Sequence, residues 1–195
     1  MPEINVSDFS YIVTSNPQLK KGRTQKLKGR GEYQHYRDFY VSLRPALKGL
    51  VKNKKSFIEL QAIVDRVSEK KRPHYKSLID KFIGWIQGKS VQQFDSPKGV
   101  YTYASTRIIC NPELNYIVEN NAKLIKLHLN GSQSMTVKRA NYICYIMSES
   151  CGFPLEQCVV LDLHQKREFK FQGGDDFEDE LYREILLFES NFMAD

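Results

Sequence analysis

The sequence predicts an α+β fold, in which a basic helical region at residues 1–90 precedes a small mixed-sheet domain at residues 91–195. Two observations predict this class. In the first 90 residues, apolar side chains recur every three or four positions, which is the spacing of an amphipathic helix. After residue 99, segments rich in β-branched and aromatic residues follow one another, as is typical of strands. We therefore expect the order β-β-β-α-β-β-α in the second domain.

Amphipathic helices are expected in three places in the basic region. Pro45 interrupts the first, so we expect a kink there. The second starts at a capping box of Ser56 and Glu59 and runs into residues 70–72, where cations suit the negative end of the helix dipole. The third starts at Pro73, a residue that a first helical turn accepts. The three helices cover about residues 33–51, 56–70 and 73–86.

Three stretches have no clear assignment to a long helix or strand. Residues 8–13 could form either, and both alternatives stay open. Residues 16–30 carry six basic residues and two glycines, so like-charge repulsion favours a loop or a frayed helix. Residues 88–99 have the glycine and polar content of a linker.

The second domain is expected to begin with a strand and a β-hairpin. The turn of the hairpin is Glu119-Asn120-Asn121. A helix follows and stops at Gly152, because glycine accepts the left-handed conformation that ends many helices. The last helix opens with acidic residues, which suit the positive end of its dipole. The strands cover about residues 100–110, 114–118, 123–129, 159–163 and 167–171, and the helices residues 134–150 and 175 onward.

The net charge of +6 conceals a strong asymmetry along the chain. Residues 1–100 hold 20 Lys and Arg against 9 Asp and Glu, or +11, while residues 101–195 hold 9 against 14, or −5. A basic half of this size indicates a polyanionic partner, and a solvated surface with clustered charges is the plainer alternative. The predicted contacts with nucleic acid are Lys20, Lys21, Arg23, Lys26, Lys28, Arg30, Arg37, Lys54, Lys55, Lys70, Lys71 and Arg72.

Several classes of protein do not fit the composition. No apolar run is long enough to span a membrane, and the first residues lack the basic and apolar stretches of a secretory signal. The four cysteines form no C-x-x-C pair, which predicts reduced thiols in a cytoplasmic protein. No phosphate loop, paired-cysteine or H-E-x-x-H motif is present, so we predict no metal ligands and no small-molecule cofactor.

The final helix has an apolar face at helical spacing. Packing on its own domain and docking into the groove of a partner protein are both compatible with this pattern. Under the docking interpretation, the partner-binding residues are Phe177, Leu181, Ile185, Phe188 and Phe192.

One short pattern carries chemistry. Glu113 precedes one strand of the hairpin and Lys126 lies on the other, which resembles the acid and E-x-K motifs of the PD-(D/E)XK nuclease superfamily. That resemblance implies carboxylates that hold Mg²⁺ and a lysine near the scissile phosphate. Leu124 stands where the superfamily has an acid, so Asp162 or Glu119 would have to supply the second carboxylate. The candidate catalytic residues are therefore Glu113, Lys126 and Asp162.

At a coarser level, residues 30–170 resemble a bacterial family of uncharacterised proteins. That resemblance implies defined places for Arg44, Glu113, Lys126 and Asp162 but no reaction. It rests on D-F-Y-x-x-L-R from Asp38 to Arg44, N-P-E-L from Asn111 to Leu114, I-K-L from Ile125 to Leu127 and V-L-D from Val160 to Asp162.

These observations together predict an accessory subunit of a larger bacterial DNA-processing or phage-defence assembly. Its basic half would bind a DNA or RNA backbone and its C-terminal half would dock on protein partners. An Mg²⁺-dependent nuclease is the second hypothesis, and a purely structural subunit is the third. Whether the protein is an enzyme stays open at this point, and Mg²⁺ enters only with the nuclease hypothesis.

Overall fold

The structure is a computed structural model that describes residues 1–30, 39–52 and 57–194. Along the described residues a run of helices precedes a run of strands, and both sheets are mixed, which confirms the α+β class. The helices are α1 (Val6–Val13), α2 (Pro17–Lys28), α3 (Leu43–Lys52), α4 (Phe57–Arg66), α5 (Arg72–Ile86), α6 (Val137–Cys151), the 3₁₀ turn η2 (Leu155–Gln157) and α7 (Phe177–Met193). The strands are β1 (Glu3–Asn5), β2 (Val91–Phe94), β3 (Gly99–Tyr103), β4 (Thr106–Cys110), β5 (Leu114–Val118), β6 (Asn121–His128), β7 (Cys158–Asp162) and β8 (Arg167–Lys170).

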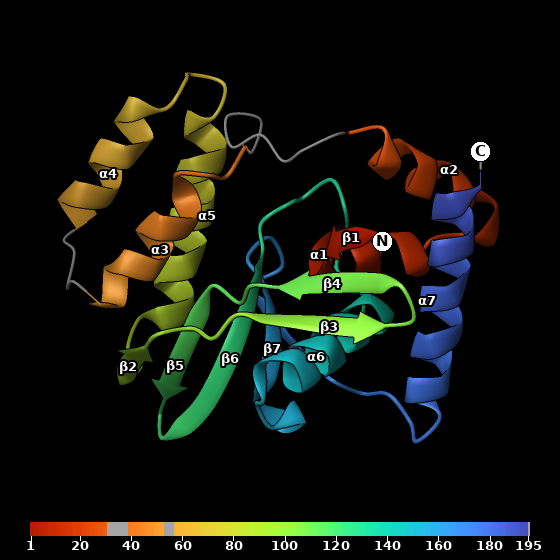
Figure 1. The fold of residues 1–195 in the computed structure, drawn as a ribbon. Helices are drawn as coiled ribbons and strands as arrows, with labels where there is room; N and C mark the ends of the chain where they lie inside the picture. The colour runs from red at the N-terminus through yellow and green to blue at the C-terminus, as the bar shows by residue number, and fades with distance from the viewer. Residues whose placement is uncertain (31–38, 53–56, 195) are drawn as a thin grey trace.

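A five-stranded sheet in the order β2-β5-β6-β7-β8 forms the centre of the molecule (Figure 1). Its neighbouring strands are antiparallel except for β6 and β7, which are parallel and are joined through α6. A parallel pair needs such a crossover because the chain must return to the starting edge of the sheet. A second sheet has the order β1-β4-β3, in which β1 runs parallel to β4.

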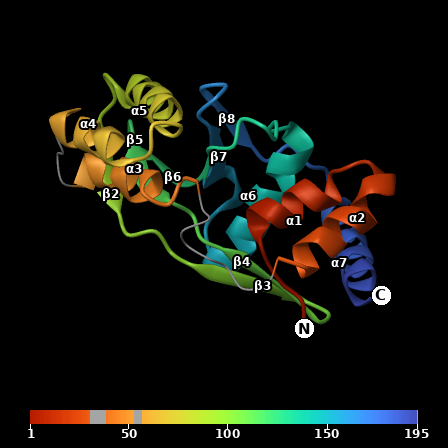
Figure 2. The same cartoon turned by 90° about the horizontal axis from the view of Figure 1, so that it is seen from above.

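Helices cover both faces of the five-stranded sheet (Figure 2). Residues of β6 and β7 alternate between the two faces, as the pleat of a strand requires. Leu124 and Val160 face a core with α1, α6 and α7, which we call the α6-side core. Ile125 and Leu161 face a core with α3, α4 and α5, which we call the α5-side core. The sheet is therefore buried on both sides.

The first 30 residues pack against the C-terminal half of the chain. Phe9 of α1 is fully buried in the α6-side core, and α2 lies along α7 at the other end of the chain (Figure 1). The helices of residues 43–86 instead cover the opposite face of the sheet. The expected division at residue 90 thus does not follow the packing, because one part of the basic region joins each core.

Several local predictions from the sequence are confirmed. The hairpin turn lies at Glu119 and Asn120, whose φ values of 50° and 66° are those of a tight two-residue turn. A helix was expected at about residues 134–150, and α6 covers Val137–Cys151. Gly152 ends α6 with φ of 65°. These features agree because each depends on neighbouring residues alone.

Other local predictions are wrong. The expected linker contains β2, which gains backbone partners from β5. The single strand expected at residues 100–110 is two strands, β3 and β4, with a turn at Ala104, whose φ is 50°. Residues 17–28 form a regular helix capped by the Asn16 side chain, and its packing on α7 overcomes the charge repulsion. Pro45 causes no kink, because α3 begins at Leu43 and its first turn needs no N–H from residue 45.

Candidate functional site

The predicted pair of Glu113 and Lys126 lies at the start of β5. The Glu113 N–H donates to the carbonyl of Ile125 at 3.1 Å, which sets Glu113 opposite Lys126 on β6. Lys126 Nζ lies 2.8 Å from Glu113 Oε1, and the N–H of Leu127 donates to Glu113 Oε2 at 2.8 Å. Arg44 Nε of α3 lies 3.6 Å from the same Oε1. The structure therefore brings together the two residues that the motif paired.

The charge balance of this cluster does not suit a magnesium site. The side chains of Glu113 and Lys126 are only 10% and 13% exposed, so their charges interact at short range with little screening. Among the described residues, one carboxylate faces two cations, Lys126 and Arg44, and both of its oxygens already accept hydrogen bonds or ion pairs. Mg²⁺ requires oxygen ligands with spare negative charge. The residues present here therefore do not fit the metal that the nuclease hypothesis needs.

Neither acid proposed as the second ligand joins this cluster. Asp162 Oδ1 accepts hydrogen bonds from the backbone N–H groups of His164 and Gln165, and Oδ2 accepts one from the Gln165 side chain. Its carboxylate thus holds the turn between β7 and β8. Glu119 lies at the far end of β5 from Glu113, in the hairpin turn. Asp162 was predicted to lie beside Glu113 and Lys126 in a catalytic site. This placement is wrong, because the hydrogen bonds of Asp162 go to His164 and Gln165 instead.

A buried polar cluster surrounds Asp162 instead. His128 lies opposite Asp162 in the β6–β7 ladder and is 7% exposed, and its Nε2 lies 2.6 Å from the carbonyl of Gln133. Arg139 of α6 is 3% exposed and reaches the Ser7 and Gln133 carbonyls. Burial, and next the charge of Arg139, lower the pKa of His128, while Asp162 opposes this shift. The folded chain therefore favours the neutral form of His128.

We expect the stability of the protein to fall as the pH drops below about 6.5, the ordinary pKa of histidine. Below that value the unfolded chain takes up a proton at His128, while the folded chain, whose His128 pKa is lowered, does not. His128→Gln keeps a donor for the Gln133 carbonyl and should lose less stability between pH 7 and pH 5 than the wild type. His74→Gln, at an exposed histidine, is the control and should match the wild type. Urea unfolding curves at both pH values measure the difference, and equal losses for the His128 variant and the wild type would contradict this prediction.

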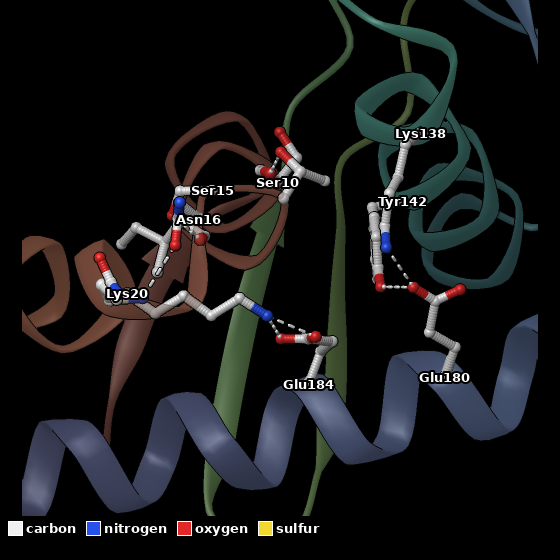
Figure 3. Close-up of polar contacts among 11 residues, drawn as sticks. Ser10, Ser15, Asn16, Lys20, Lys138, Tyr142, Glu180 and Glu184 are labelled. Atoms are coloured by element: carbon white, nitrogen blue, oxygen red, sulfur yellow. Dashed lines mark hydrogen bonds and ion pairs between the residues drawn. The ribbon is translucent and has the colours of Figure 1, made fainter.

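The basic residues of α2 are largely engaged within the molecule. Lys20 is buried, and its Nζ contacts both oxygens of Glu184 on α7, at 2.5 and 2.6 Å (Figure 3). On the same face of α7, Glu180 accepts bonds from Lys138 and Tyr142 of α6 (Figure 3). Acids of α7 thus attach that helix to α2 and α6. The prediction of Lys20 as a nucleic-acid contact is wrong, because its ammonium group is not available at the surface.

The other predicted cations differ in their surroundings. Arg23 stacks on Tyr11 at 4.1 Å, and Arg30 pairs with Asp8 at 3.4 Å. Lys28 is exposed but reaches the Ala194 carbonyl at 3.3 Å. Lys21, Lys26 and Lys70 are exposed, and Arg37, Lys54 and Lys55 lie outside the described residues.

The interpretation of α7 as a docking helix is wrong for its apolar face. Phe177, Leu181, Ile185 and Phe188 are 5% exposed or less and belong to the α6-side core, and Phe192 packs against it. The alternative, packing on its own domain, is what the structure shows. Phe9 of α1 and Tyr142 of α6 pack against this face, so it has no room for a partner protein.

Cations also gather at the start of α5 and along one side of this helix. Lys70, Lys71 and Arg72 were expected at the end of the preceding helix, but α4 ends at Arg66 and these residues open α5 instead. Three more lysines, Lys76, Lys81 and Lys166, line a groove between α5 and the turn that joins β7 to β8, together with Pro73, Ser77 and Asp80. The Lys81 ammonium donates to the His164 carbonyl at 3.2 Å, which fixes the turn beside the helix. Sequence reasoning missed this groove because Lys166 lies 85 positions after Lys81.

Comparisons with known proteins add no family. No family model matches the chain, and no curated protein matches it. Within residues 1–30, 39–52 and 57–194, no helix is both long and apolar enough to cross a membrane. The same residues contain no group of three or more His, Cys, Asp or Glu side chains arranged to hold a metal ion.

Proposed function

We propose that this protein binds the phosphate backbone of a nucleic acid through the cations of α5 and the adjoining turn, as an accessory subunit of a larger assembly. We define this α5 surface by Lys70, Lys71, Arg72, Lys76, Lys81 and Lys166. One observation carries the proposal. The positive end of the α5 dipole bears Lys70, Lys71 and Arg72, and the first turn of the helix contains no acid.

The Arg72 guanidinium donates hydrogen bonds to the Asp65 and Val67 carbonyls at the end of α4, at 3.2 and 3.3 Å. The positive charges are nevertheless unfavourable for the N-terminus of α5 itself. The N-terminus of a helix carries the positive end of its dipole, so carboxylates stabilise it and ammonium groups do not. The α5 surface keeps like charges at that end, and an anion bound there would interact favourably with both the side chains and the dipole. Phosphate groups spaced along a nucleic acid can contact Lys70 at the start of α5 and Lys76 and Lys166 further along the same surface.

Two pairs of charge reversals test this function. Lys76→Glu with Lys166→Glu changes the α5 surface, and Lys21→Glu with Lys26→Glu makes the same change in net charge on α2. All four side chains are exposed. We expect the α5 pair to weaken binding to a generic DNA or RNA duplex by tenfold or more and to reduce the salt dependence by about two phosphate contacts. The α2 pair should weaken binding less than threefold.

Fluorescence anisotropy over a range of salt concentrations gives both quantities. Equal losses from the two pairs would show that only net charge matters, and stronger loss from the α2 pair would favour the original prediction for that helix. Absence of salt-dependent binding by the wild type would overturn the proposal and favour the purely structural hypothesis.

The nuclease hypothesis keeps one supporting observation, the pairing of Glu113 and Lys126 across β5 and β6. The charge balance of the cluster opposes it, because the carboxylate is already neutralised. We therefore expect the purified chain to leave DNA and RNA intact in the presence of Mg²⁺ or Mn²⁺. Cleavage by the wild type that disappears in Lys126→Met would favour the nuclease over the accessory role.

A further inference from the structure

Two cysteines that are far apart in the sequence meet near Lys126. Cys110 is the last residue of β4 and Cys151 is the last residue of α6. Gly99 lies opposite Cys110 in the β3–β4 ladder, and an ideal Cβ at Gly99 would lie only 2.1 Å from the carbonyl oxygen of Ser150. The last turn of α6 therefore rests directly on this ladder position. Paired residues of a ladder share a face, so Cys110 lies on the face that this turn covers. Cys151 follows Ser150 and packs against the core cluster that contains Cys110, so the two thiols are neighbours.

The two thiols have different surroundings. Cys110 is fully buried, while Cys151 is partly exposed and its Sγ also lies 3.7 Å from Ser150 Oγ. The neighbouring Cys110 thiol, together with Ser150 and the charge of Lys126, lowers the pKa of Cys151 to about 7, although burial opposes the shift. The neighbouring Cys151 thiol, together with burial, raises the pKa of Cys110. Cys151 is thus the exposed and more acidic thiol, and Cys110 is the protected neighbour.

The other two cysteines provide an internal comparison. Cys144 of α6 and Cys158 of β7 are both fully buried in the α6-side core. Burial is the first cause that raises the pKa of each thiol. Thiolates are the reactive form of cysteine, so a raised pKa and burial both protect this second pair.

We propose that Cys110 and Cys151 form a reversible intramolecular disulfide by exchange with a small-molecule disulfide. The Cys151 thiolate attacks one sulfur of the oxidant, forms a mixed disulfide and releases one small thiolate. Cys110 then loses its proton to solvent, attacks the Cys151 sulfur of the mixed disulfide, and releases the second small thiol. The chain loses two electrons and two protons, and the oxidant is reduced to two thiols.

The bond would connect the end of β4 to the end of α6. Both thiols lie within electrostatic reach of Lys126, whose charge lowers the pKa of each of them. Oxidation removes the negative charge of the Cys151 thiolate near Lys126. The Lys126 ammonium group then keeps its ion pair with the Glu113 carboxylate. This inference does not depend on nucleic-acid binding, so it can fail or succeed independently of the proposed function.

Oxidised glutathione is the probe for the test. The full-length reduced protein is incubated with it at pH 7.5, quenched with acid, denatured and alkylated, and the free thiols are counted by mass spectrometry. We expect two of the four thiols to disappear without a retained glutathione, and peptide mapping should join Cys110 to Cys151. Dithiothreitol should restore all four.

Single variants distinguish the two roles. Cys110→Ser should stop the reaction at a stable glutathione adduct on Cys151, while Cys151→Ser should suppress modification at least tenfold. Cys158→Ala is the matched control in the second pair and should leave the exchange unchanged. Circular dichroism shows whether each variant is folded.

A second measurement needs no variant. The rate of alkylation of the native protein by iodoacetamide should show a single fast thiol, Cys151, whose rate rises with pH and reaches half of its maximum near pH 7. Lys126 and Cys110 are the titratable neighbours that influence this midpoint. Four unreactive thiols, a lasting glutathione adduct in the wild type, or equal oxidation of Cys144 and Cys158 would each overturn the proposal.

Discussion

Glu113→Gln lowers the free energy of unfolding by about 3 kcal/mol, because it leaves a buried ammonium group without its countercharge. Lys126 is 13% exposed and its Nζ lies 2.8 Å from Glu113 Oε1. Glutamine has the same shape but carries no charge to balance Lys126 and Arg44. Urea denaturation with linear extrapolation measures the loss.

The matched variants are Lys126→Met and the double variant Glu113→Gln with Lys126→Met. Methionine removes the ammonium group and keeps most of the aliphatic stem, so the double variant should recover at least half of the loss. Recovery shows that the pair supports the fold. A neutral or stabilising effect of Glu113→Gln alone would contradict this structural role, and would return the pair to the list of candidate catalytic residues.

Gly99→Ala lowers the free energy of unfolding by about 3 kcal/mol, because its new methyl group overlaps the end of α6. An ideal Cβ there lies 2.1 Å from the Ser150 carbonyl oxygen and 2.4 Å from its carbonyl carbon. These are backbone atoms in a helix, so they cannot move aside as the tip of a side chain would. The same displacement should separate Cys110 from Cys151 and slow the formation of their disulfide.

Gly22→Ala is the control for this substitution. Gly22 lies inside α2 with no atom within 4 Å of an added Cβ. Alanine in a helix interior is favoured over glycine, so we expect a gain of about 0.5 to 1 kcal/mol. Thermal and urea unfolding of both variants should thus change in opposite directions. A gain or no change for Gly99→Ala would show that α6 does not rest on β3 as described.

The candidate site was only partly predictable. The pairing of Glu113 with Lys126 followed from the hairpin, because the turn at residues 119–120 sets the register and the register sets opposite residues. Asp162 was wrongly predicted to be catalytic. An Asp in the sequence can bind a metal or accept hydrogen bonds from a turn, and the residue type alone does not distinguish these roles. The groove of Lys76, Lys81 and Lys166 could not be found, since nothing in the local pattern places the β7–β8 turn beside α5.

Burial in the folded chain decides which of the predicted binding residues are available to a partner. Lys20 and Lys21 are neighbours in a basic stretch, yet Lys20 is buried against Glu184 while Lys21 is exposed. The apolar residues of α7 showed an amphipathic helix, but an apolar face fits an internal core and a partner groove equally well. Only the packing of α7 on α1 and α6 selects between these two uses.

The sequence by itself determined the α+β class, the hairpin turn, the end of α6 at Gly152 and the amphipathic faces, because these depend on hydrogen bonds and spacing among near neighbours. The tertiary structure alone decided the sheet order, the pairing of β2 with β5, the contact of Cys110 with Cys151 and the side of the molecule on which each cation lies. Such contacts join residues tens of positions apart. Their energies depend on which surfaces are buried together, and no short stretch of sequence contains that information.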